Sequence, residues 1–188
     1  WVSEHAAELG DDPGRLVVAG DSAGGNLAAV LSLLARDRGG PAIAHQFLIY
    51  PATDFDYDSG RWPSLEENAE GYLLELATMR WFATNLVGDR DPVAEPLAAD
   101  PMAAPICATD HAGLPPATVT VAGFDPLRDE GLAYAEVLGG AGVPVEVLHH
   151  GEQIHGYWIV APLVPSSGSA RDVDLAALRA AIEALPIG

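Results

Sequence analysis

The sequence predicts an α/β fold in which a mainly parallel sheet is flanked by helices. Short apolar runs alternate along the chain with segments of helical periodicity, as expected when helices cross over between parallel strands. The first runs, residues 16–19 and 47–50, are apolar throughout and therefore predict strands that are buried on both faces. Hydrophobic residues make up 49% of the 188 residues, which is enough for one domain with a sizeable core.

The first predicted elements are a helix, a strand and a second helix, joined by turns. Residues 1–10 have the spacing of an amphipathic helix, which Gly10 ends. Residues 16–19 are predicted to be a strand, and residues 26–36 carry leucine and valine at helical spacing. The glycine-rich segment between them, residues 20–25, is expected to be a turn from strand to helix.

The remaining elements continue this alternation. Further strands are predicted at residues 47–50, 117–122 and 145–149. Further helices are predicted at residues 78–86, with Thr78 as a cap, at residues 129–140 and at residues 170–185. The proline-rich segment 91–116 has no clear periodicity, and its length is more typical of a functional loop than of a plain connection.

The strongly negative charge of the chain argues against negatively charged binding partners. Acidic residues outnumber basic ones by 27 to 9, which gives a net charge of −18. Such a surface repels phosphate backbones and anionic lipids, so neither nucleic acid nor an anionic membrane is expected as a partner. The sequence contains no apolar run of the roughly 18 residues that a membrane-spanning helix needs.

The cysteine content and the start of the chain bear on its location. The one cysteine, Cys107, rules out an intrachain disulfide and fits a reducing compartment, so a cytoplasmic location is expected. The chain starts at Trp1, inside the first predicted helix. We therefore expect an upstream segment, in which a signal peptide would not be visible here.

A short motif in the strand-turn-helix segment points to nucleophilic catalysis. Residues 20–24 read Gly-Asp-Ser-Ala-Gly, which matches the G-x-S-x-G pattern of a serine on a sharp turn. Ser22 is then expected at the carboxyl edge of the sheet, where the backbone N–H of Ala23 would donate to an oxyanion. The other residues of this nucleophile turn are Gly20, Asp21, Gly24 and Gly25. An ordinary glycine-rich turn is the alternative.

A serine nucleophile also needs a histidine as base and a carboxylate that orients the histidine. In this setting they follow in the order serine, acid, histidine. Asp125 follows the predicted strand 117–122 and fits the acid. Asp129 and Glu130 compete with it, although Asp129 is placed to cap the next helix and Glu130 to lie in its first turn.

Six histidines compete for the base. His155 follows the last predicted strand in a loop with glycines on both sides, which would let its imidazole reach across the sheet edge. His149 and His150 close that strand, where His149 is expected to be a core residue. The others lie on a helix, ahead of the strand ends or in the proline-rich segment. His155 is therefore the predicted base.

Several segments resemble the bacterial hormone-sensitive-lipase-like esterases. The resemblance rests on the nucleophile turn 20–28, on segments 113–117 and 123–131 around the acid, and on the histidine segment 154–157, in the family's order. It implies a partial α/β-hydrolase fold, the C-terminal strands of a mainly parallel sheet with flanking helices. Residues 1–188 would be the C-terminal part of a single domain, with Ser22, Asp125 and His155 as its triad.

The resemblance implies a carboxylic ester hydrolase for small short-acyl esters, which forms an acyl-enzyme intermediate and uses no metal and no organic cofactor. A homodimer is expected for the full-length parent. The triad does not separate esterases from lipases, amidases or peptidases. Plant gibberellin receptors resemble these esterases but have lost the histidine, so a ligand-binding protein is an alternative that His155 argues against.

One departure from the family pattern concerns the oxyanion hole. The family carries a His-Gly-Gly-Gly motif upstream of the nucleophile, and this sequence contains no such string. The loss of one oxyanion donor typically costs about 2.7–4 kcal/mol of transition-state stabilisation. A catalytically weak or inactive fragment is therefore a further alternative.

Two more segments have chemical interpretations. Tyr72, Leu73, Leu74 and Phe82 belong to an apolar-aromatic group that forms either helix core or, as the resemblance favours, a wall of the substrate pocket. The acidic segment 54–60 resembles the start of a calcium loop, but its glycine falls at the seventh position and its twelfth position is a leucine. A solvated acidic loop without metal is expected there.

Overall fold

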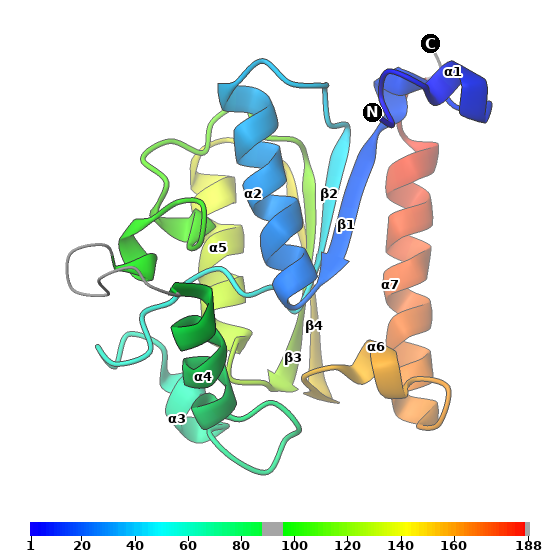
Figure 1. Cartoon of the computed structure of the whole chain (residues 1–188). Helices are drawn as coiled ribbons and strands as arrows, with labels where there is room; N and C mark the ends of the chain where they lie inside the picture. Colours follow the sequence, from blue (N-terminus) through cyan, green and yellow to red (C-terminus); the bar gives the residue numbers. More distant parts are fainter. Residues whose placement is uncertain (88–95, 187–188) are drawn as a thin grey trace.

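Four parallel strands form one sheet within residues 1–87 and 96–186, the parts of the chain that this computed structural model describes. Their order is β1 (Val17–Asp21), β2 (His45–Ile49), β3 (Ala117–Phe124) and β4 (Val145–Ile154) (Figure 1). The helices are α1 (Ala6–Leu9), α2 (Ala23–Asp37), α3 (Pro63–Glu67), α4 (Leu76–Val87), α5 (Arg128–Gly140), α6 (Tyr157–Val160) and α7 (Pro165–Glu183). Short 3-10 helices cover Pro13–Arg15, Leu97–Ala99 and Pro105–Cys107. Because the strands are parallel, their carboxyl ends share one edge of the sheet.

Two helical layers enclose the sheet (Figure 1). Helices α2 and α5 pack on one face, where Leu48 of β2 and Leu138 of α5 belong to the larger core cluster. Helix α7 packs on the other face, where Ile49 and Ala170 belong to the smaller cluster.

All of β2 is buried, its apolar residues Phe47–Ile49 as well as the polar His45 and Gln46. His45 contacts the hydroxyl of Thr118. The side-chain amide of Gln46 donates to the carbonyl of Pro115, so each of the two polar side chains has a hydrogen-bond partner in the interior.

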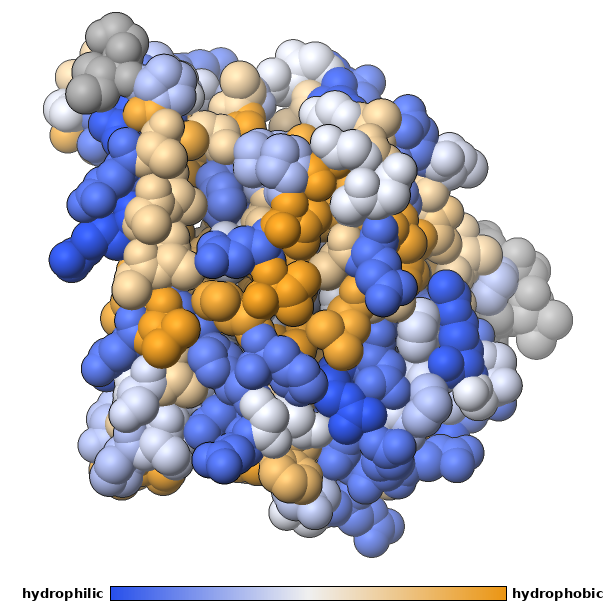
Figure 2. All heavy atoms as spheres, turned by 180° about the vertical axis from the view of Figure 1, so that it is seen from behind, coloured by the Kyte–Doolittle hydropathy of each residue, from blue (hydrophilic) through white to orange (hydrophobic). Residues whose placement is uncertain are grey.

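The two edge strands are β1 and β4, and within the described residues no further strand pairs with their outer sides. Val147 of β4 is 43% exposed. Seen from behind, apolar side chains gather in the middle of the molecular face (Figure 2). None of the helices in the described ranges is long and apolar enough to cross a membrane.

The predicted mainly parallel sheet with flanking helices is confirmed, and each predicted strand is present. Strand β4 continues beyond the predicted end at His149, because its pairing with β3 resumes after an irregularity and joins Phe124 to Ile154. Gly123 allows this close pairing, since a Cβ there would lie only 2.1 Å from the carbonyl oxygen of Gly151.

Three details of the helix predictions are wrong. Helix α1 is a single turn rather than ten residues long, because the preceding residues form turns. Helix α4 begins at Leu76, so Thr78 lies inside it and is not a cap. Asp129 does not cap its own helix, whose N-cap is Leu127. Its carboxylate instead accepts a hydrogen bond from the N–H of Ser64 in the first turn of α3.

Candidate active site

Ser22 alone forms the turn between β1 and α2. Its φ of 53° and ψ of −118° are a conformation that residues other than glycine rarely adopt. Backbone hydrogen bonds from outside α2 hold it: the N–H of Ser22 donates to the carbonyl of Ile49 at 2.8 Å, and its carbonyl accepts from the N–H of Ala52 at 3.2 Å. The end of β2 and the loop after it therefore keep the strained serine at the carboxyl edge of the sheet.

The glycines around Ser22 serve close packing more than the turn itself. A Cβ on Gly20 would lie 2.2 Å from the carbonyl oxygen of Gly24, and one on Gly25 would lie 2.8 Å from Cβ of Pro51. Gly20 and Asp21 still belong to β1, and Gly24 and Gly25 already belong to α2. The expected turn over residues 20–25 is thus narrower than predicted, because the glycines let strand and helix meet directly.

Asp125 lies directly after β3 and is fully buried. One carboxylate oxygen, Oδ1, accepts a hydrogen bond from the N–H of Leu127 at 2.8 Å. Helix α3 and its C-cap residue support the same turn. The hydroxyl of Ser64 in α3 donates to the carbonyl of Pro126, and the side-chain amide of Asn68, the C-cap, donates to the carbonyl of Asp125. The turn is therefore fixed from two sides, with Oδ2 left for another partner.

His155 directly follows β4 and joins the other two predicted residues. Its Nδ1 lies 2.7 Å from Oδ2 of Asp125, and its Nε2 lies 3.0 Å from Oγ of Ser22. An ionised carboxylate can only accept hydrogen bonds, so Nδ1 carries the proton. Nε2 of the neutral imidazole then accepts the hydrogen bond of the serine hydroxyl, which is the arrangement that a general base needs.

Ala23 is the first residue of α2, immediately after Ser22. The first backbone N–H groups of a helix have no acceptor within the helix, and the helix dipole favours negative charge at this end. The N–H of Ala23 is thus suited to a negatively charged oxygen next to Ser22.

The four predicted pocket residues have different surroundings. Tyr72 stacks on Phe124, the residue before Asp125, with ring centroids 5.1 Å apart. Cδ2 of Leu73 lies 3.0 Å from the place that a Cβ on Gly156 would occupy, directly after His155. Leu74 packs against the hydrophobic core, as the alternative interpretation has it. Phe82 lies on α4 against Trp81 and is 53% exposed.

Tyr50 is a site residue that the sequence analysis did not identify. It follows β2, has a φ of 35°, and places its ring centroid 4.7 Å from that of His155. Its hydroxyl donates to Asp21 at 3.3 Å. Burial, followed by the charge of Asp21, raises the pKa of this hydroxyl, so Tyr50 acts as a neutral donor. Its place between a buried strand and Pro51 is the signal that could have drawn attention to it.

The competing residues have other surroundings. His149 is exposed, so its predicted place in the core is wrong. Nε2 of His150 lies 2.7 Å from Oδ1 of Asp174.

The acidic loop 54–60 differs from its prediction at Asp54. This residue was predicted to be solvated, but it is buried and accepts hydrogen bonds from Arg61 and Trp62, so that prediction is wrong for Asp54. Within the described ranges, no group of three or more His, Cys, Asp or Glu side chains is arranged to hold a metal ion.

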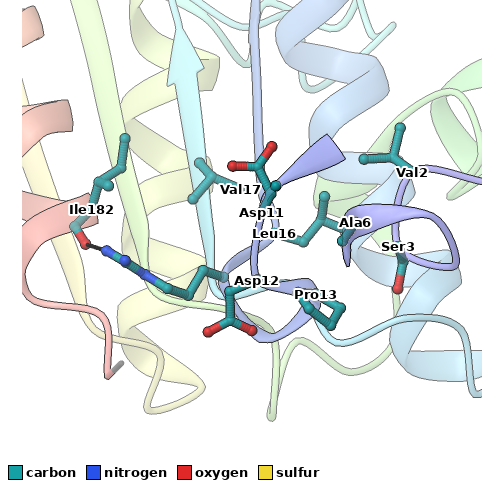
Figure 3. A pocket seen from close by; sticks show the side chains of 11 residues that line it. Val2, Ser3, Ala6, Asp11, Asp12, Pro13, Leu16, Val17 and Ile182 are labelled. Carbon is teal, nitrogen blue, oxygen red and sulfur yellow. Dashed lines mark hydrogen bonds between the residues drawn. The ribbon is translucent and has the colours of Figure 1, made fainter. Parts of the chain in front are cut away.

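A pocket of about 480 Å³ lies near the amino end of β1 (Figure 3). Ser22 follows the other end of this strand. Its lining includes Val2, Ala6 and Leu16, and Arg15 closes one side by donating to the carbonyl of Ile182 at 2.7 Å. It is therefore separate from the site at the carboxyl edge.

Comparison with known proteins connects this site to a family. The family model described as the alpha/beta hydrolase fold matches residues 1–159, which include the segments that carry Ser22, Asp125 and His155. The chain belongs to the α/β-hydrolase family. Its similarity to mycobacterial esterases places it among the hormone-sensitive-lipase-like members, as predicted.

Individual relatives of this α/β hydrolase are named as esterases. Esterase LipI of Mycobacterium tuberculosis is 46% identical over 179 residues, which are 95% of this chain and 54% of LipI. Ethyl acetate hydrolase of Pseudomonas putida is 40% identical over 151 residues, 78% of this chain and 44% of that protein. A crystal structure of a thermostable esterase from P. putida matches this structure with a TM-score of 0.85 at 37% identity. The match covers 100% of this chain and 57% of the esterase chain. The chain thus spans about half the length of the curated relatives it matches.

Proposed function

We propose that Ser22, Asp125 and His155 are the catalytic triad of a carboxylic ester hydrolase that acts on small short-acyl esters. The observation that carries this proposal is the pair of contacts made by one imidazole, 3.0 Å to the hydroxyl of Ser22 and 2.7 Å to the carboxylate of Asp125. Esterase names among the relatives support the reaction class.

In the proposed reaction, Nε2 of His155 takes the proton of Ser22 while Oγ bonds to the ester carbonyl carbon. The tetrahedral intermediate collapses, the bond to the alcohol oxygen breaks, and His155 gives its proton to the departing alkoxide. Water then attacks the acyl group on Ser22, with His155 taking the water proton and passing it to Oγ as the acid leaves. Asp125 stays ionised and orients the imidazole. The scheme needs neither a metal nor an organic cofactor.

The oxyanion of both intermediates would accept a hydrogen bond from the N–H of Ala23. Further donors would come from the His-Gly-Gly-Gly motif, which this chain does not contain. We therefore propose that residues 1–188 are the C-terminal part of a single α/β-hydrolase domain, and that turnover by these residues alone is weak. A homodimer of the full-length parent and a cytoplasmic location stay predictions.

The proposed substrate class rests on the surroundings of His155. Tyr72 and Leu73 lie next to residues that flank Asp125 and His155, so we propose that they form an apolar wall of the substrate pocket. Leu74 and Phe82 were predicted to share this role, but their contacts with the core and with Trp81 give it less support. The name of the ethyl acetate hydrolase relative supports a short acyl group.

Labelling with a serine-reactive phosphonate tests the proposed function. In the full-length parent, we expect the phosphonate to attach to Ser22. We expect the His155→Ala variant of that protein to react at least about 1000-fold more slowly, since a triad that lacks its base loses most of its rate. His149→Ala removes an exposed histidine within the same strand, β4, and serves as the matched control, with an unchanged rate expected.

Two outcomes would count against the esterase proposal. Attachment of the phosphonate to another serine would exclude Ser22 as the nucleophile. Tight binding of a short ester without any labelling of Ser22 would favour the alternative of a ligand-binding protein.

A further inference from the structure

A second buried carboxylate lies on the face of the sheet that α7 covers. Asp174 of α7 is fully buried and accepts hydrogen bonds from three side chains. Nε2 of His150 lies at 2.7 Å, Nε1 of Trp158 lies at 2.6 Å, and the hydroxyl of Tyr157 forms the third contact. A buried carboxylate is costly unless several donors satisfy it, so this one links β4, α6 and α7 firmly.

Tyr157 connects this carboxylate to the active site. It lies two residues after His155 and is fully buried. Its hydroxyl also lies 3.0 Å from the hydroxyl oxygen of Thr120 in β3. Its ring contacts that of Tyr50 edge-on at 5.2 Å, and Tyr50 in turn lies 4.7 Å from the imidazole of His155. Tyr157 can therefore affect the position of His155 in two ways, through the short backbone segment between them and through the ring of Tyr50.

The chemistry of Tyr157 suits a permanent donor. Burial, followed by the charge of Asp174, raises the pKa of its hydroxyl. The hydroxyl thus keeps its proton and donates it to Asp174, while Thr120 fills the remaining position. This fixes the start of α6, which is only one turn long and is preceded by Gly156 with a φ of 75°. Because Gly156 has no side chain that restricts its backbone, the position of the neighbouring His155 imidazole depends on the contacts that hold Tyr157.

We propose that Asp174 is a positioning residue for His155, which it holds in reach of Ser22 by anchoring Tyr157 and the turn at Gly156. The inference rests on the proposed function, since it takes His155 to be the base. It assigns to α7 a part in the reaction, although no residue of α7 belongs to the triad.

The substitution Asp174→Asn tests this inference. An amide keeps the size of the side chain but offers one acceptor oxygen and an N–H₂ group, so it cannot satisfy all three donors. We expect phosphonate labelling of Ser22 to slow by about 10- to 100-fold, because small displacements of a reacting group have effects of that size. The exposed Asp172 lies on the same helix, and Asp172→Asn is the matched control with an unchanged rate.

Tyr157→Phe provides a milder second test, because it removes only the hydroxyl that joins Asp174 to the turn. If both residues act through the same contact, the double variant should label no more slowly than the slower single variant. Proton NMR adds a measurement that does not depend on overall stability. The signal of the proton between Nδ1 of His155 and Asp125 should shift in both variants and not in Asp172→Asn.

The outcomes separate this inference from the proposed function. Unlabelled Ser22 in the full-length wild-type parent would contradict the esterase proposal itself. A labelled wild-type protein whose folded Asp174→Asn and Tyr157→Phe variants keep the wild-type rate and NMR signal would overturn only the role of Asp174. If Asp174→Asn does not fold, Tyr157→Phe alone decides.

Discussion

At the scale of single residues, Glu130 is a fully buried carboxyl group between the loop after β2 and helix α5. Its Oε1 accepts hydrogen bonds from the backbone N–H groups of Thr53 and Asp54, at 2.7 and 3.1 Å. Its Oε2 is buried without a hydrogen-bond partner among the described residues. Burial raises the pKa of Glu130 well above its usual value, and the charges of Asp54 and Asp125 raise it further.

Glu130→Gln should therefore gain stability over the wild-type protein as the pH rises. Above the pKa of Glu130 in the unfolded chain, about 4.3, the unfolded wild type releases a proton that the folded protein keeps. The free energy of unfolding then falls by up to about 1.4 kcal/mol per pH unit until the folded pKa is reached, and glutamine has no such proton. Urea unfolding of both proteins between about pH 5 and 8 measures the difference.

The control for this prediction is Glu136→Gln, an exposed position on the same helix, which should follow the wild-type pH dependence.

Of the groups that face Glu130, Tyr57 keeps its proton, because burial and the charge of Glu130 raise its pKa. Asp54 and Asp125 are therefore the facing charges. Parallel curves for wild type and Glu130→Gln would show that Glu130 is ionised in the folded protein.

Residue roles differ in how far the sequence determines them. Ser22 and His155 were predictable because a motif and a strand end place them at one edge of the sheet. The place of Tyr50 before Pro51 could have marked it as a strand end, but not its role, since its positive φ and its contact with His155 arise from tertiary packing. Asp129 shows the same limit, because its carboxylate caps a helix that is distant in sequence. Local patterns identify the chemistry, whereas long-range partners decide how each group is held.

At the scale of elements, the junction of β3 and β4 controls the distance between Asp125 and His155. Each residue follows one of these strands, and the strands pair closely where Gly123 faces Gly151. The sequence predicted both strands from their apolar residues. It did not predict that β4 continues to Ile154, because the polar segment around Gly151 has no strand pattern and is held by pairing with β3.

Gly123→Ala should disrupt this junction. The added Cβ would lie 2.1 Å from the carbonyl oxygen of Gly151, a backbone atom that cannot move without separating the strands. We expect a loss of about 1–3 kcal/mol in the free energy of unfolding, as for other overpacked sites, together with slower labelling of Ser22. Thermal and urea unfolding measure the first effect.

The matched control is Gly139→Ala, in α5, where an added Cβ has no atom within 4 Å. Alanine is favoured over glycine within a helix, so this variant should gain about 0.5–1 kcal/mol and label at the wild-type rate. Equal stability of the two alanine variants would contradict the role given to the strand junction.

At the scale of the whole molecule, the sheet has an open side next to the nucleophile. The outer edge of β1 has no paired strand within the described residues, and an apolar groove of about 400 Å³ runs beside it, lined by Ala19, Phe47 and Leu175 among others. Ile159 and Leu163 are 70% and 86% exposed. The apolar pattern that predicted buried strands thus does not reveal that the outer edge of β1, like that of β4, stays unpaired in these residues.

The 188-residue chain expressed alone should consequently aggregate, despite its net charge of −18, because an unpaired edge beside apolar surface is a template for association with other chains. Ala19→Lys places a charge on β1 at the open side, whereas Ala180→Lys adds the same charge at an exposed position of α7. If the edge drives association, light scattering and the soluble fraction should improve for Ala19→Lys and not for Ala180→Lys. Equal behaviour of the two variants would assign the association to another surface. A monomeric wild-type chain that rapidly hydrolyses a short-chain nitrophenyl ester would contradict both the predicted aggregation and the proposed weak turnover.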